Sequence, residues 1–137
     1  MIQLTYISSA VPGLIERDVA DILKASRNNN APAGVTGLLL YNGRRFLQAL
    51  EGESGAVNIV YRRIKTDRRH RACVLLSSTE ISQRAFGSWA MAAQPIDGSA
   101  PRASLIERVE QLTSAIADPT IRAHFRSFAA LPVPNAS

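Results

Sequence analysis

Polar side chains with hydroxyl or amide groups occupy positions where the hydrophobic pattern of this 137-residue chain predicts buried surface. Tyr6 belongs to an alternating apolar segment, and Asn30 lies just past the first predicted helix. Gln48 stands within Phe46-Leu47-Gln48-Ala49-Leu50. A buried amide without partners costs about 1–3 kcal/mol, so another part of the chain or a ligand with polar edges must satisfy these groups.

The chemistry open to this set is hydrogen bonding to a flat polar ligand rather than hydrolysis. Ser26, a polar position in a helical apolar stripe, joins the set, and each group can both donate and accept. No general-base carboxylate, glycine-rich phosphate loop or metal-ligand spacing accompanies them, so we expect neither an enzyme nor a metal site. The set suits a heteroaromatic ring, and a water-filled polar network is the structural alternative.

Composition and charge narrow the class of protein. The chain has 46% hydrophobic and 20% charged residues, which is typical of one soluble globular domain. The single cysteine, Cys73, lies in an apolar run and is expected to be a buried, inert thiol. No segment approaches roughly 20 apolar residues and no signal peptide is visible, which predicts a cytoplasmic protein without a membrane span.

The net charge of +5 permits a phosphate-bearing partner but does not require one. Arginines are concentrated in one part of the chain, at Arg62, Arg63, Arg68, Arg69 and Arg71. A solvated surface is the commoner explanation of such a cluster, and contact with phosphate or nucleic acid is the alternative.

Periodicity divides the first two-thirds of the chain into strands and helices that must position these groups. Strands are predicted over 2–7, 34–41, around 46–50, 71–77 and 86–92, and helices over 14–28 and 54–66. This β-α-β-β-α-β order with one extra strand is that of a ferredoxin-like sandwich, an α+β fold. In the last strand Trp89 and Met91 point to the same side, because they are two residues apart.

Asn42-Gly43 predicts a hairpin, because both residues tolerate the positive φ of a type I′ turn. If Tyr41 pairs with Arg44 across that turn, Gln48 lies opposite Gly37. An amide that faces a glycine on an apolar surface leaves room for a flat ligand to approach the sheet.

Two amphipathic helices are predicted after a linker over 95–101. Ser104 and Glu107 have the spacing of a capping box for the first, and Asp118-Pro119 is a start signal for the second. The helices should cover the sheet face left bare by the first two, in this subunit or in a partner's. We therefore divide the chain into a domain over 1–94 and a linker with a helical extension over 95–137.

The residues of 2–92 resemble the BLUF domains, blue-light sensors that use flavin. The resemblance is carried, in order and with matching spacing, by Leu4-Thr5-Tyr6-Ile7-Ser8, Ser26-Arg27-Asn28-Asn29-Asn30, Gly34-Val35-Thr36-Gly37-Leu38-Leu39, Phe46-Leu47-Gln48-Ala49-Leu50-Glu51-Gly52, Ile64-Lys65-Thr66-Asp67-Arg68-Arg69-His70 and Phe86-Gly87-Ser88-Trp89-Ala90-Met91. Each fragment alone is weak, and the six together are specific.

The resemblance implies a flavin held non-covalently between the two helices, with FAD expected and FMN as the alternative. Asn30 would bind the pyrimidine edge of the ring, with Arg63 and Asp67 near that edge and Ser26 bordering the ring. The resemblance places Asn29, Arg69 and His70 toward the ribityl-phosphate chain. Part of the arginine cluster would thereby have a phosphate partner.

The resemblance also implies a photochemical role for Tyr6 and Gln48. In this family the excited flavin takes an electron and then a proton from the tyrosine. The glutamine ends in a changed hydrogen-bond arrangement at a ring carbonyl, by rotation, tautomerisation or both. Trp89 and Met91 would report this change by exchanging which is buried, and core packing is their structural alternative.

After Met91 the sequence shows no cyclase, phosphodiesterase or DNA-binding segment, which is typical of short, single-domain members of the family. We therefore expect a photosensory signalling protein without an attached enzyme, which forms a homo-oligomer and contacts a downstream protein. A light-independent interaction module and an RNA-binding module are the alternatives. RNA binding is disfavoured because no strand carries the exposed aromatic pattern of such modules.

Overall fold

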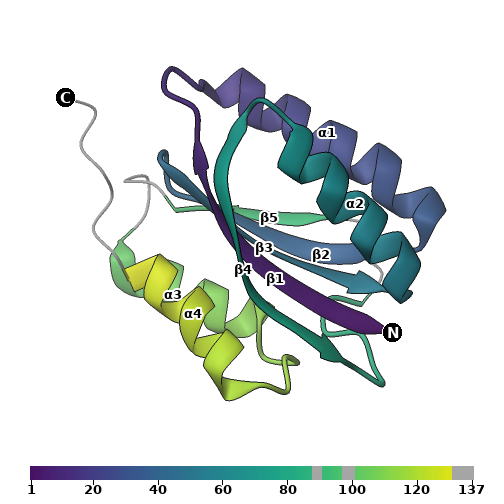
Figure 1. Cartoon of the computed structure of the whole chain (residues 1–137). Coiled ribbons are helices and arrows are strands. Elements are labelled where there is room, and N and C mark those ends of the chain that lie inside the picture. Colours follow the sequence, from purple (N-terminus) through teal and green to yellow (C-terminus); the bar gives the residue numbers. More distant parts are fainter. Residues whose placement is uncertain (88–90, 97–100, 131–137) are drawn as a thin grey trace.

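A computed structural model describes residues 1–87, 91–96 and 101–130 (Figure 1). In chain order the elements are β1 (Ile2–Ala10), α1 (Glu16–Ala33), β2 (Thr36–Tyr41), β3 (Arg45–Gly52), α2 (Ser54–Thr66), β4 (His70–Glu80), β5 (Ala92–Pro95), α3 (Arg102–Leu112) and α4 (Pro119–Ala130). Among these described helices, none has the length and apolar character needed to cross a lipid bilayer.

The ferredoxin-like α+β fold is confirmed. The sheet has the strand order β4-β1-β3-β2-β5, with α1 and α2 side by side on one face (Figure 1). The extra strand is present, but its predicted position over 86–92 is wrong, since β5 begins at Ala92 and pairs parallel with β2. The backbone N–H of Phe86 donates to the Glu51 side chain and Gly87 has a φ of +59°, so the chain is turning where a strand was predicted.

Helix α1 is longer than its hydrophobic pattern predicts. It continues through Pro32 and ends at Gly34, whose left-handed conformation (φ 69°) directs its backbone N–H to the carbonyls of Ala31 and Asn30. Asn30 therefore lies in the last turn of α1 and not past its end, which corrects the prediction.

The β2–β3 register differs from the prediction by two residues. Tyr41 pairs with Phe46, so Gln48 lies opposite Leu39 and Gly37 opposite Leu50. The turn is wider than a type I′ turn because the Asn42 side-chain oxygen accepts hydrogen bonds from two later backbone N–H groups at 3.0 and 2.9 Å. A shift of two residues keeps every side chain on its predicted face.

Each face of the sheet has its own core. On the α1–α2 face, Leu4, Tyr6, Leu39, Phe46 and Leu50 pack with residues of both helices. On the opposite face the strands pack against α3 and α4 through alternate residues. The predicted cover of the bare sheet face is thus provided within the same subunit, which also covers the surface that an RNA-binding module of this fold would expose.

The boundaries of the C-terminal helices were only partly predicted. Helix α3 begins at Arg102, directly after Pro101, and has no capping box, so the Ser104–Glu107 prediction is wrong. Helix α4 begins at Pro119 as predicted, and the Asp118 carboxylate accepts a hydrogen bond from the backbone N–H of Thr120 at 2.8 Å.

Candidate functional site

A small cavity of about 70 Å³ lies between α1, α2 and the sheet. Its polar lining is provided by side chains from both helices, from β3, from the α2–β4 connection and from the first residue of β4: Ser26, Asn29, Asn30, Gln48, Arg63, Asp67, Arg69 and His70. These are the eight residues that the resemblance assigned to flavin binding. Its apolar lining consists of Ile22, Ala25, Leu39, Val60 and Ile64.

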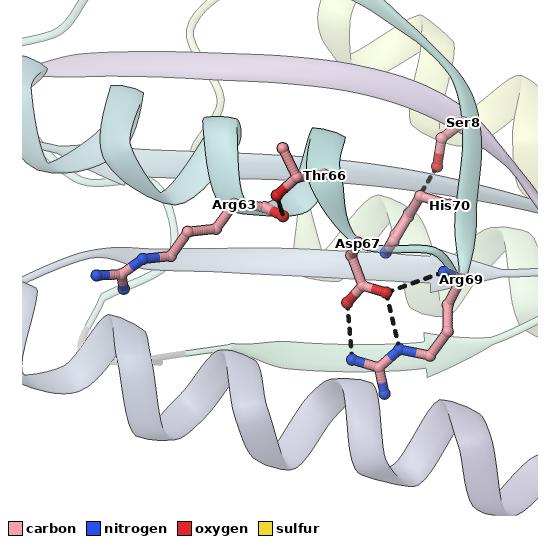
Figure 2. Close-up of polar contacts among 6 residues, drawn as sticks. All are labelled: Ser8, Arg63, Thr66, Asp67, Arg69 and His70. Carbon is pink, nitrogen blue, oxygen red and sulfur yellow. Dashed lines mark hydrogen bonds and ion pairs between the residues drawn. The ribbon is translucent and has the colours of Figure 1, made fainter.

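Helical spacing brings the lining residues of the two helices to one space. Ser26 and Asn30 are one helical turn apart on α1, and Asn30 is only 1% exposed. From α2 comes Arg63, whose side chain extends away from Asp67 (Figure 2). Asp67 follows the last residue of α2, because its extended backbone (φ −72°, ψ 124°) ends the helix.

Asp67 and Arg69 form a local clamp at the end of α2 (Figure 2). The Arg69 guanidinium donates to both carboxylate oxygens of Asp67, from Nε at 3.0 Å and from a terminal nitrogen at 2.7 Å. The Arg69 backbone N–H donates to the same carboxylate at 2.9 Å. These hydrogen bonds lower the pKa of Asp67, so the carboxylate stays ionised beside the cavity.

His70 connects the cavity to β1. Its Nδ1 lies 2.9 Å from the Ser8 hydroxyl oxygen (Figure 2), and its ring centroid lies 4.6 Å from that of Phe46. Burial lowers the pKa of His70, with the nearby Asp67 carboxylate opposing and Arg69 adding to the shift. The imidazole is therefore neutral near pH 7 and can serve as either donor or acceptor toward a ligand.

Gln48 joins the cavity to two residues behind it. Its Oε1 accepts a hydrogen bond from the Tyr6 hydroxyl, and its Nε2 lies 3.2 Å from the Met91 sulfur. Tyr6 is 0% exposed and Met91 3% exposed. The structure therefore brings together the predicted photochemical residues that it describes. Trp89, the fourth, lies outside the described residues.

Burial of the phenol raises the pKa of Tyr6 well above its usual range, with smaller contributions from Cys73, Tyr61 and Asp67. Tyr6 therefore keeps its hydroxyl proton at any physiological pH. The Tyr61 ring packs against it with a centroid distance of 5.2 Å. The phenol is consequently a neutral, desolvated hydrogen-bond donor, and its hydroxyl donates to Gln48 Oε1.

Glu51 is a functional candidate that the sequence interpretation did not assign. This fully buried carboxylate accepts hydrogen bonds from the backbone N–H groups of Ala85 (2.8 Å) and Phe86 (2.9 Å). It also accepts from the Thr36 hydroxyl at 2.9 Å and from the Gln3 amide at 3.4 Å. A charged residue at an inward-facing strand position was the available sequence signal. Glu51 ties the β4–β5 connection to the strand that carries Gln48.

The donors, acceptors and apolar side chains that line the cavity fit the chemistry of a flavin ring. The pyrimidine edge of such a ring presents carbonyl acceptors beside an N–H donor, and the amides of Asn29 and Asn30 supply both complementary groups. The apolar lining suits the two ring faces. Because ligand sites for molecules of this size span roughly 300–1,000 Å³, binding must displace part of the lining.

A larger open groove of about 700 Å³ lies on the other side of α1, over β2 and β5. It shares Leu39 with the cavity, but none of the eight predicted binding residues lines it. The smaller cavity is therefore the candidate ligand site, because the donors and acceptors converge there.

Comparison with known proteins also supports a flavin ligand. The family model described as sensors of blue light using FAD (BLUF) matches residues 1–92. The photoactivated adenylate cyclase subunit alpha of Euglena gracilis is 39% identical over 88 residues, which is 64% of this chain and 9% of that protein. The chain thus spans about a tenth of the length of this curated relative.

Two solved structures resemble the fold over most of this chain. The dark-state structure of BlrB, a BLUF protein, has a TM-score of 0.72 and 30% identity and covers 94% of this chain and 95% of that one. Klebsiella pneumoniae BlrP1 with FMN and cyclic diGMP has a TM-score of 0.80 and 27% identity, over 94% of this chain and 34% of that one.

Proposed function

This chain belongs to the BLUF family of blue-light sensors that use flavin, and on that premise we propose that it senses light through Tyr6, Gln48 and Met91. The observation that carries the proposal is the position of Gln48. Its side chain lines the cavity and hydrogen-bonds to both of the other residues behind it. A change at the ligand thereby reaches two buried groups through one amide.

The eight cavity residues would hold the flavin, with FAD as the expected form from the family description and FMN as the form named for BlrP1. Asn30 and Asn29 would bind the ring edge or the start of its side chain. Arg69 and His70 would lie toward the ribityl-phosphate chain of the flavin, where a phosphate group could pair with Arg69, and Asp67 would lie near the ring edge. Ser26 and Arg63 border the same space.

A bound flavin supplies absorption of blue light and, once excited, accepts an electron and a proton. The protein contributes Tyr6, which holds its hydroxyl proton against Gln48 Oε1 in a desolvated site. Loss of that proton would remove the donor from Gln48 Oε1. The amide would then be free to adopt a second arrangement.

Reversal of the Gln48 amide would break its contact with Met91. In the structure Nε2 faces the thioether sulfur, which is a weak acceptor. After reversal Oε1 would face a sulfur that has no proton to donate, and Nε2 would face the Tyr6 oxygen. Gln48 thus has one arrangement that retains Met91 and another that does not.

β3 provides a route to the other side of the sheet. Gln48 faces α1 and α2, while its neighbours Leu47 and Ala49 belong to the core shared with α3 and α4. A displacement of β3 would therefore alter the packing of α3 and α4 against the sheet. We infer that these helices carry the output as a contact with another protein or with a second copy of the chain.

Similarity to BlrB over 95% of that chain supports an output that needs no enzyme domain within this sequence. The domain division proposed from the sequence places the output helices in 95–137. Because α3 and α4 share a core with the sheet, light would alter an existing packing surface. The predicted homo-oligomer remains part of this proposal.

The test is a light-minus-dark absorption spectrum of the purified chain after incubation with FAD and, separately, FMN. A yellow protein whose blue band shifts reversibly to longer wavelength supports the proposal. A chain that binds neither flavin, or binds one without a reversible shift, contradicts it. Size-exclusion chromatography in the dark and under blue light tests whether self-association is the output.

A further inference from the structure

Met91 is held at three different points. Its sulfur accepts from Gln48 Nε2 at 3.2 Å, and its methyl group lies against Gly37, where a Cβ would stand 3.1 Å from Met91 Cε. Its backbone carbonyl accepts a hydrogen bond from Arg27 Nε at 3.0 Å. The first two contacts hold the side chain, whereas the Arg27 contact holds the main chain.

Arg27 lies on α1 next to Ser26 but is not part of the cavity lining. Its side chain instead reaches from the exposed side of the helix to the residue that precedes β5. The hydrogen bond joins residues 64 positions apart and connects the ligand-binding helix to the far edge of the sheet. Its place indicates a role in fixing Met91 and not in holding the ligand.

The main chain at Met91 lies just before the paired residues of β5. The β2–β5 ladder begins with the Leu38–Ala92 pair, so the sheet pairing starts one residue after Met91. β5 itself spans only Ala92–Pro95 at the edge of the sheet. The Arg27 hydrogen bond therefore restrains the Met91 carbonyl at the point where this pairing starts.

We propose that Arg27 is a positioning residue that holds the Met91 backbone in place and thereby keeps the Met91 sulfur on Gln48 in the dark. The inference rests on the proposed function, because a dark and a lit state exist only if the chain senses light. The hydrogen bond from Arg27 to the Met91 carbonyl is present in the structure in either case. When Gln48 releases the sulfur, Arg27 determines how far the Met91 segment can move. Arg27 therefore sets the balance between two positions of Met91.

The experiment uses the two methionines of the chain, Met1 and Met91, labelled with ¹³C at the methyl group and observed by NMR. Met1 is exposed and Met91 is buried, so their signals should be well separated. The full chain is compared with Arg27→Ala, Arg27→Lys and, as a control on the same helix, Arg17→Ala. Each is measured without flavin, with FAD in the dark and with FAD under blue light.

For Arg27→Ala we expect the Met91 signal to shift or broaden in the dark toward its position in light, with a second population raised about fivefold. Arg27→Lys should restore much of the wild-type signal because the ammonium group can donate to the same carbonyl. Arg17→Ala should match the wild type. Flavin absorption should be retained in all of them.

A Met91 signal in Arg27→Ala that is indistinguishable from that of the wild type and Arg17→Ala, with and without flavin, would overturn the inference. Failure of lysine to restore the signal more than alanine does would also count against it. If the wild type shows no light response, the proposed function fails separately, because the flavin-free spectra still measure whether Arg27 positions Met91.

Discussion

Tyr6 and Gln48 are direct cross-strand partners of β1 and β3, and the Tyr6 hydroxyl donates to the Gln48 carbonyl oxygen within the sheet. Opposed residues on one face of an antiparallel pair have Cβ atoms about 4.5–5.5 Å apart. Two adjacent ladder positions thus bring a phenol and an amide into contact without any loop. The geometry is held by the backbone ladder, so changes of side-chain chemistry should leave it intact.

Tyr6→Phe should remove the light-induced red shift while flavin stays bound. The substitution preserves the ring but leaves Gln48 Oε1 without its donor, which should destabilise the fold by about 1–3 kcal/mol. The light-minus-dark spectrum and a urea unfolding curve measure the two effects. Tyr61→Phe is the matched control, since the Tyr61 ring packs on Tyr6 without a hydrogen bond to Gln48. A normal photocycle in Tyr6→Phe would exclude Tyr6 as the donor.

Glu51→Gln should destabilise the fold by about 2–3 kcal/mol although it conserves shape. Each Glu51 oxygen accepts hydrogen bonds from two donors. Replacing one oxygen with NH₂ therefore places an N–H donor opposite two groups that also donate. Chemical denaturation measures the loss. Glu53→Gln is the control, because Glu53 is exposed and makes no side-chain cap at the start of α2. Equal stability of the two variants would show that Glu51 does not hold the β4–β5 connection.

The hydrophobic pattern was sufficient to predict the order of the helices and strands up to β4 and the face of the sheet on which Tyr6 and Gln48 lie. Tyr6 and Gln48 were expected on the covered face, and both are buried there. That they pair with each other was not predicted, because the β1–β3 ladder joins segments about 40 residues apart and local pattern carries no information on that register.

Errors arose where side-chain hydrogen bonds replace backbone preferences. Asn42 caps its own turn and widens the hairpin, which changes the β2–β3 register. Glu51 binds two backbone N–H groups of the connection, so the last strand begins later than its apolar residues indicate. Arg27 was quoted within a motif, but its contact with the Met91 carbonyl depends on tertiary structure alone.

The stability of the protein should fall as the pH drops below about 6.5, the usual pKa of histidine. Burial lowers the pKa of His70 in the folded state, so the unfolded chain takes up its proton first and is favoured. The Asp67 carboxylate opposes this shift, and Arg69 adds to it. Urea unfolding between pH 7 and 5 measures the effect, and His70→Gln should flatten it.

His124→Gln is the matched control for this pH dependence, since His124 is exposed on α4. Its unfolding free energy should follow the wild-type pH profile. If His70→Gln retains the full acid-side loss, the loss has another origin and His70 is not its cause. The window above pH 5 separates His70 from Asp67, whose lowered pKa places its own titration at more acid pH.

Gly37→Ala should be destabilising and should move Met91. A Cβ at Gly37 would stand 2.2 Å from the Ala49 backbone oxygen and 3.1 Å from Met91 Cε. The first contact involves backbone of the adjacent strand, so β2 or β3 must shift at a cost of about 1–3 kcal/mol. The second contact pushes the Met91 methyl group away from residue 37 and so weakens the Met91 contact with Gln48.

Gly55→Ala should change the stability of the protein in the opposite direction. Gly55 lies in α2, and a Cβ there has no atom within 4 Å, so alanine should stabilise the helix by about 0.5–1 kcal/mol. Thermal unfolding should order the three proteins as Gly55→Ala, wild type and Gly37→Ala, from most to least stable. In the light-minus-dark spectrum only Gly37→Ala should differ from the wild type. A Gly37→Ala variant with unchanged stability and an unchanged Met91 methyl signal would show that close packing at Gly37 does not position Met91.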